Sequence, residues 1–206
     1  FLAVFRAHGR DQWSQAPAAQ VRHPELAGRW QARRYPVAAV CRGCTESGVS
    51  RMARPYLVMV RAGAASLHQQ WLADDPDRNW DCWVSWYCEP AGHGEAAVEF
   101  ESDGGDNKFE GYLQGRDALA LSLDEYRYVA LLDDDLEFPP GGISQTFSQC
   151  ERAHADLAQP ALRWGSNVNH DVTLYNPLTD VRRVSFVEVM MPFFSKDTLR
   201  FLEPSF

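Results

Sequence analysis

Three consecutive carboxylates, Asp133, Asp134 and Asp135, directly follow a largely apolar run at residues 126–132. The run has the residue types of a buried strand, so the pattern indicates a strand that delivers acids to the edge of a sheet. Adjacent carboxylates repel one another, and a cation among them removes that cost. Oxygen ligands favour Mg2+ or Mn2+, which complete their shells with water and substrate phosphate oxygens. We interpret the acids as a metal-diphosphate site, with a solvated acidic turn as the alternative.

Length and composition predict one globular domain. The chain has 206 residues, of which 45% are hydrophobic, enough for one substantial core. We expect the domain to span residues 55–206, with residues 1–54 as a poorly defined N-terminal extension and linker. The net charge of -8 argues against a general binder of nucleic acid or anionic membranes. No apolar run approaches the roughly 20 residues of a membrane span, and we expect a cytoplasmic protein.

Strand and helix patterns alternate from Pro55 onward, which is typical of an α/β fold. Helical spacing is clearest for Ile143, Phe147 and Cys150, and Ser195 is a candidate N-cap. Strands are predicted at residues 1–5, 56–60, 81–87, 97–101, 126–132, 157–160, 171–174 and 184–191. Helices are predicted at residues 64–73, 108–123, 143–154 and 195–202.

Two further strand ends carry polar residues. Arg61, Ala62 and Gly63 end the first strand of the domain, where Gly63 permits close approach of a ligand and Arg61 could face a phosphate or a base. Ligands of open α/β sheets bind beyond such carboxyl ends, so these residues are candidates for nucleotide binding. Glu188 lies inside an apolar run at residues 184–191, and a buried carboxylate must be paired or chemically employed.

Six segments together resemble a little-characterised family related to the GT-A nucleotide-sugar glycosyltransferases. The resemblance covers about residues 55–206, and it is specific as a set rather than motif by motif. The segments are RAG at 61–63, SLH at 66–68, GDNKF at 105–109, YVALLDDD at 128–135, DLAQPAL at 156–162 and FVEVMMP at 186–192.

This resemblance implies a GT-A-like, Rossmann-like fold with a mixed, mostly parallel sheet flanked by helices. It also implies a nucleotide-diphosphosugar donor, expected first to be of the UDP type, and a Mn2+ or Mg2+ ion held by an Asp-x-Asp element. Asp133 would lie near the ribose or the metal's water shell, and Asp135 would bind the ion. Asp134 would face the transferred sugar as a catalytic group or be solvated, and His170 would complete the metal shell or be a solvent-exposed loop residue. The family continues beyond the position of Phe206, so we expect further residues of the domain to follow.

Transfer to a saccharide or other hydroxyl acceptor also needs a base, and Glu188 is the candidate. Its alternative role is an ion pair with Arg182 or Arg183. Lys108 follows a glycine-rich turn and would contact the diphosphate or fix that loop, unless it is a surface lysine. Trp164 would stack on an acceptor sugar or pack in the core.

Two other functions remain open. A catalytically silent module that binds a sugar nucleotide and a metal would carry the same acids. A haloacid-dehalogenase-type phosphatase also uses an Asp-x-Asp pair, in which one Asp is the nucleophile. That fold places its acids on the first strand, whereas Asp133 and Asp135 follow at least two predicted strands.

Overall fold

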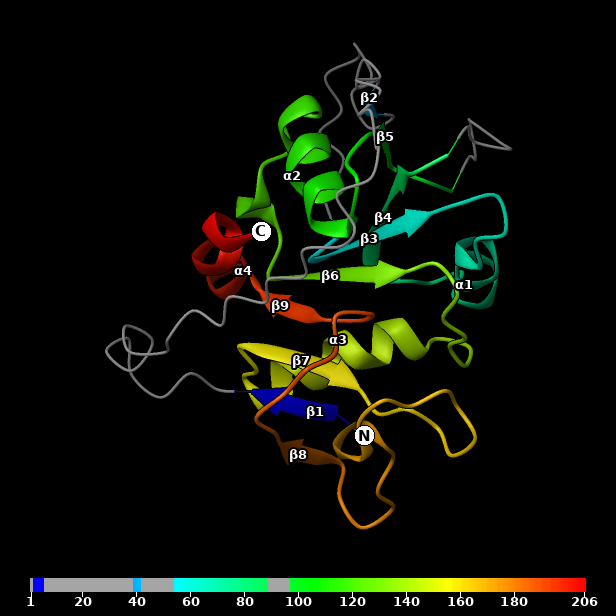
Figure 1. Ribbon diagram of the computed structural model, residues 1–206, viewed down its shortest axis with the longest axis vertical. Helices are drawn as coiled ribbons and strands as arrows, with labels where there is room; N and C mark the ends of the chain where they lie inside the picture. The colour runs from blue at the N-terminus through cyan, green and yellow to red at the C-terminus, as the bar shows by residue number, and fades with distance from the viewer. Residues whose placement is uncertain (1, 6–38, 42–53, 89–96) are drawn as a thin grey trace, which may run out of the picture.

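The computed structural model describes residues 2–5, 39–41, 54–88 and 97–206, which form an α/β structure with helices on both faces of one sheet (Figure 1). The predicted α/β class is therefore confirmed. The described strands are β1 Leu2–Phe5, β2 Ala39–Cys41, β3 Tyr56–Ala62, β4 Trp80–Trp86, β5 Phe100–Asp103, β6 Tyr128–Asp133, β7 Leu157–Pro160, β8 Val181–Arg183 and β9 Phe193–Ser195.

The sheet has the order β2-β5-β4-β3-β6-β9-β7-β1-β8. Strands β5, β4, β3 and β6 are parallel neighbours, whereas β9 is antiparallel to both β6 and β7. Strand β7 consequently runs in the same direction as β6. Within the six strands from β5 to β7, five share one direction, so the sheet of the predicted domain is mixed and mostly parallel, as expected.

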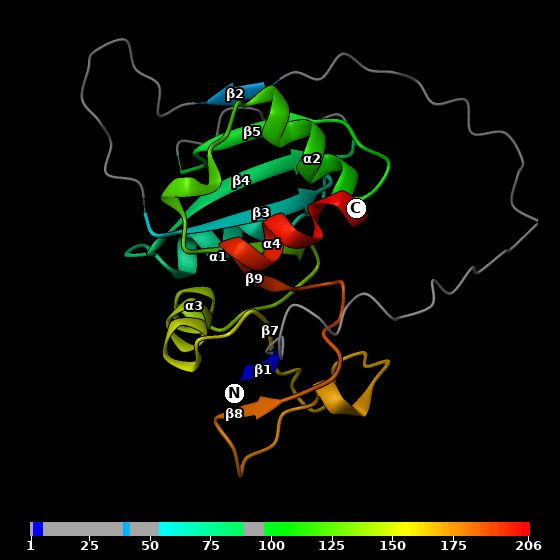
Figure 2. The ribbon, with the colours of Figure 1, turned by 90° about the vertical axis from the view of Figure 1, so that its left-hand side faces the viewer.

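Four α-helices cover this sheet: α1 His68–Asp74, α2 Lys108–Ala118, α3 Gly142–Ala153 and α4 Lys196–Leu202. Helices α1 and α3 pack on one face, and α2 and α4 pack on the other (Figure 2). Three short 3-10 helices complete the described helices: η2 Leu123–Glu125, η3 Asp171–Thr173 and η4 Glu203–Ser205. Among the described residues, no helix has both the length and the apolar character needed to cross a membrane.

Side-chain alternation along β3 and β6 decides where polar groups can lie. The even-numbered residues of β3 pack toward α1 and α3, whereas Leu57 and Met59 pack toward α2 and α4. Both faces of the strand are buried, which explains its continuous apolar run. By the same alternation Arg61 and Asp133, which are partners in the β3–β6 register, both belong to the α2 face.

The turn before α2 places Lys108 in the first turn of that helix. Gly105 adopts a φ of +76°, and a Cβ atom there would lie 2.3 Å from a backbone nitrogen of α2, so a larger residue does not fit. Asn107 caps the helix, because its side-chain oxygen accepts hydrogen bonds at 3.0 Å from the amides of Phe109 and Glu110. Lys108 is thereby fixed at the end of α2 nearest to β6.

Several predicted elements are confirmed with shifted boundaries. Helix α3 buries Ile143, Phe147 and Cys150 as predicted. Ser195 caps α4, where its hydroxyl oxygen accepts a hydrogen bond from the Thr198 amide at 3.3 Å. The helix predicted at 64–73 begins only at residue 68, and the one predicted at 108–123 ends at residue 118. The strand predicted at 97–101 lies at residues 100–103.

Two predicted strands are wrong. Residues 171–174 form the 3-10 helix η3 and one isolated bridge rather than a strand. Residues 184–191 are irregular, and the strands lie on either side of them as β8 and β9. The backbone there still follows the edge of β6, since the carbonyls of Met190 and Pro192 accept hydrogen bonds from Asp133 and Leu131 at 2.9 and 3.0 Å. Pro192 has no N–H to donate back to β6, so the regular pairing of β9 begins only at Phe193.

The predicted N-terminal extension contributes to the same sheet. Strand β1, predicted at residues 1–5, pairs with β7 and β8, and β2 pairs with β5. Residues 1, 6–38 and 42–53 lie outside the described part of the chain.

The packing between β3, α3 and β9 predicts the effect of a core truncation. Phe147 is fully buried, stacks on Tyr56 with ring centroids 4.5 Å apart, and meets the edge of Phe193 at 4.9 Å. Phe147→Ala should lower the free energy of unfolding by about 3–5 kcal/mol. The exposed Phe201 provides the control, because Phe201→Ala should change it by less than about 0.5 kcal/mol. Urea denaturation of both variants measures the difference, and equal effects would contradict the packing described.

Candidate functional site

The sheet changes its direction of winding between β3 and β6. The chain proceeds from β3 outward to β4 and β5, and then returns to place β6 on the other side of β3 (Figure 1). In open α/β sheets ligands bind beyond the carboxyl ends of the strands at such a switch point. Here the switch point carries Arg61, Ala62 and Gly63 from β3 and its following turn, and Asp133 to Asp135 from β6. The structure therefore brings the two predicted strand ends together.

Asp134 joins these two strand ends. Its Oδ2 atom accepts a hydrogen bond from the Gly63 amide at 2.7 Å, and its carbonyl accepts one from the Leu67 amide at 2.8 Å. The hydroxyl of Tyr87 also lies 3.4 Å from Oδ2. A charged acceptor bound to a backbone amide is a strong contact. This carboxylate thus fixes the turn after β3.

Lys108 connects Asp133 to the segment before β9. Its Nζ atom donates to Asp133 Oδ1 at 2.8 Å and to the Val189 carbonyl. The residue is only 7% exposed, so it is not the surface lysine of the alternative interpretation. Burial lowers the pKa of Lys108, and the neighbouring carboxylate of Asp133 opposes that shift. The side-chain nitrogen of Lys108 is therefore held at the end of β6.

Arg61 is engaged with the protein itself. Its guanidinium donates to Ser85 Oγ at 2.9 Å, to the Trp86 carbonyl at 3.0 Å and to the Gly104 carbonyl at 2.6 Å, with a further bond to the Gly105 carbonyl. Burial lowers the pKa of Arg61. The sequence suggested a contact with phosphate or base, whereas these bonds clamp the glycine turn that precedes α2.

Glu188 is buried beside this arrangement. It is 5% exposed, and its amide donates to Gln159 Oε1 at 2.5 Å. Its Oε1 atom has no hydrogen-bond partner among the described residues, and no described ion pair joins Glu188 to Arg182 or Arg183. The next residue, Val189, supplies the carbonyl that binds Lys108. Glu188 is therefore connected to Asp133 through the Val189 carbonyl and Lys108. The strand predicted for Glu188 is absent.

The predicted metal ligands are only partly assembled. Asp135 is exposed and Asp133 half-exposed, whereas the exposed His170 packs against Phe186 with ring centroids 4.5 Å apart. Within the described ranges, no three His, Cys, Asp or Glu side chains form a group that could hold a metal ion. A Mg2+ or Mn2+ ion that takes its other ligands from water and phosphates needs only one or two carboxylates, and the candidates at the end of β6 are Asp133 and Asp135. They do not form a closed protein cage that includes His170.

Two residues that contact the site were not predicted from the sequence, and one alternative for Trp164 is excluded. Tyr87 was included in a strand, but it follows β4 and is exposed beside Asp134. Gln159 lies in β7 and was not singled out, although its side chain holds the Glu188 backbone. Trp164 is exposed, so it does not pack in the core.

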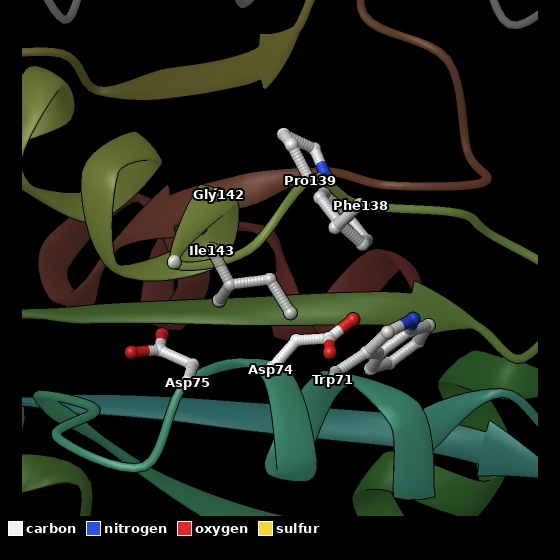
Figure 3. Close-up of a pocket in the computed structure, with 8 residues that line it drawn as sticks. Trp71, Asp74, Asp75, Phe138, Pro139, Gly142 and Ile143 are labelled. Atoms are coloured by element: carbon white, nitrogen blue, oxygen red, sulfur yellow. The ribbon is translucent and has the colours of Figure 1, made fainter.

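A small hollow lies on the α1 side of the sheet, apart from Lys108. Trp71, Asp74 and Asp75 line it from α1 and its C-terminal end, facing Phe138 and Ile143 across the gap (Figure 3). With about 10 Å³ open to the centre of a water molecule, it is at the lower limit for holding a single water. This hollow is too small to hold a substrate.

Comparisons of the chain with protein-family models, with curated proteins and with solved structures gave no match. What the site can do therefore follows from its own residues and their geometry.

The contacts of Asp134 and Asp135 predict different effects of their removal on stability. Asp134→Ala should lower the free energy of unfolding by about 1–3 kcal/mol, because the Gly63 amide loses a charged acceptor. Asp135→Ala should change it by less than about 0.5 kcal/mol, since this side chain is exposed. Chemical denaturation distinguishes the two, and a larger loss for Asp135→Ala would show that the roles are reversed.

Proposed function

We propose that this chain is a metal-dependent glycosyltransferase that moves a sugar from a nucleotide-diphosphate donor to a hydroxyl acceptor. The observation that carries the proposal is the convergence of Gly63, Asp133, Asp135 and Lys108 at the switch point of the sheet. The GT-A assignment of the fold belongs to this proposal. It is supported by the mostly parallel sheet and by the position of the acids after its fourth parallel strand in chain order.

A bound metal ion would make the end of β6 complementary in charge to a diphosphate. A diphosphate brings negative charge, and the acids of the β6 end would repel it without a cation. Asp133 and Asp135 would hold Mg2+ or Mn2+, which when bound neutralises charge on the departing diphosphate. Lys108 contributes a second positive charge at the same place, already fixed by Asp133 Oδ1 and the Val189 carbonyl.

Glu188 is proposed as the base of a direct displacement. The acceptor hydroxyl oxygen forms a bond to the anomeric carbon while the bond from that carbon to the donor's β-phosphate oxygen breaks. The nucleoside diphosphate leaves with the electron pair, and the hydroxyl proton passes to Glu188. The buried Oε1 atom of Glu188, which has no hydrogen-bond partner among the described residues, suits this role. Gln159 would hold the backbone of this residue in place.

The metal-binding part of the proposal predicts a loss of affinity in Asp135→Asn. Calorimetry should show that Mn2+ strengthens UDP binding to the wild-type chain. In the variant, Mn2+ should no longer strengthen UDP binding, while folding is unchanged. The loss of affinity should exceed the fall of about 10- to 100-fold that is typical when an outer-shell partner is removed. The exposed Asp77, which precedes β4 and so lies at the opposite edge of the sheet, gives the control Asp77→Asn. Tight Mn2+-dependent binding by Asp135→Asn would rule out direct ligation.

Turnover separates an enzyme from a silent binding module. Release of nucleoside diphosphate from a panel of nucleotide sugars with Mn2+ is the expected result for the wild-type chain. Glu188→Gln should keep donor binding but lower transfer by about 100- to 10,000-fold. Its unfolding free energy should not fall, because Oε1 makes no hydrogen bond to a described residue that the change could break. Unfolding of this variant would indicate a structural role, and donor binding without release by the wild type would favour the silent module.

A further inference from the structure

Tyr87 is an exposed aromatic residue that is nevertheless held in place. It directly follows β4 and is 57% exposed. Its amide donates to the Ala62 carbonyl at 3.1 Å, which fixes its backbone against the end of β3. Single exposed aromatic residues are ordinary on protein surfaces. The contacts of this ring are what distinguish it.

Three neighbours restrain the Tyr87 ring. A Cβ atom on Gly63 would lie 2.2 Å from the tyrosine oxygen, so the ring rests against the glycine backbone. The Asp134 carboxylate lies 3.4 Å from the hydroxyl. The guanidinium carbon of Arg61 lies 5.6 Å from the ring centroid, within cation–π range. Arg61 is buried whereas Tyr87 is exposed, so the ring packs against a buried cation and still presents surface to solvent.

Gly63 lies against the tip of the Tyr87 ring. A Cβ atom there would overlap the ring tip, so a larger residue at position 63 would push the ring aside.

The position of Tyr87 across the sheet matches the reach of a nucleotide. Ala62 pairs with Trp86, and Arg61 pairs with Asp133. Tyr87 directly follows β4, Asp134 and Asp135 directly follow β6, and β3 lies between these two strands. Two strand spacings separate the ends of β4 and β6, about 10 Å. A ribose and its phosphates can bridge that distance.

We propose that the Tyr87 ring is the surface on which the nucleobase of the donor stacks. This inference rests on the proposed function, because it uses the diphosphate position at Asp133 and Asp135. The rigid ring offers an aromatic face at little cost in ordering. Stacking is tolerant of base identity, so Tyr87 strengthens the binding of nucleoside diphosphates without choosing among bases.

The experiment compares nucleoside diphosphates with inorganic pyrophosphate, which lacks a base. Binding of UDP, ADP, GDP and pyrophosphate is measured by calorimetry with Mn2+ for the wild type, Tyr87→Ala, Tyr87→Phe and Phe201→Ala. Tyr87→Ala should weaken every nucleoside diphosphate by about 5- to 150-fold and leave pyrophosphate unchanged. Tyr87→Phe should retain most of the affinity because it keeps the ring. Phe201→Ala, a matched loss of an exposed ring on α4, should change nothing.

Other outcomes overturn the stacking role. Unchanged binding of nucleoside diphosphates by Tyr87→Ala contradicts it directly. An equal loss for pyrophosphate would mean that Tyr87 acts through Asp134 on the phosphate region. In both cases the proposed function stands, because the wild type still binds the diphosphate. A wild-type chain that binds neither pyrophosphate nor any nucleoside diphosphate overturns the proposed function and this inference together.

Discussion

Parallel pairing of β3 with β6 brings the two polar strand ends of the candidate site side by side. Helices cover both faces of these strands, so their interiors admit only apolar side chains, and polar groups are confined to the ends. The register then sets Arg61 beside Asp133, both on the face covered by α2. The bond from the Gly63 amide to Asp134 fastens the two ends together. One edge of the sheet therefore gathers the groups from which the proposed chemistry is built.

Each of the two buried basic side chains at this edge of the sheet, Arg61 and Lys108, has hydrogen-bond acceptors beside it. The ammonium of Lys108 is offset by Asp133 and a backbone carbonyl, and the guanidinium of Arg61 by four neutral oxygens. Glu188 differs, because its buried Oε1 atom has no hydrogen-bond partner among the described residues. Native structures leave few buried polar atoms unsatisfied. Under the proposed function, an acceptor hydroxyl would supply the missing donor to Glu188.

The sequence predicted those features that depend on local pattern. The apolar run before Asp133 and the cap at Ser195 needed only their own residue types, and both are confirmed as structural elements. The strand predicted at 184–191 is wrong, because regular pairing with β6 begins only after Pro192. Strand β6 is distant in sequence, so the local pattern could not show where that pairing begins. The contacts of Tyr87 and Arg61 could not be predicted from the sequence for a similar reason. Tyr87 contacts Gly63 and Arg61 contacts Gly104, and only the folded sheet brings these residues together. The resemblance to GT-A glycosyltransferases stays a prediction.

In the proposed function, a metal ion at the end of β6 holds the diphosphate of a nucleotide. A crystal structure of the protein with Mn2+ and UDP would locate both groups, because anomalous scattering identifies manganese independently of the nucleotide. We expect an anomalous peak between the carboxylates of Asp133 and Asp135, with both phosphates of UDP beside it and beside Lys108. A nucleotide bound elsewhere, or manganese bound away from these two acids, would contradict it.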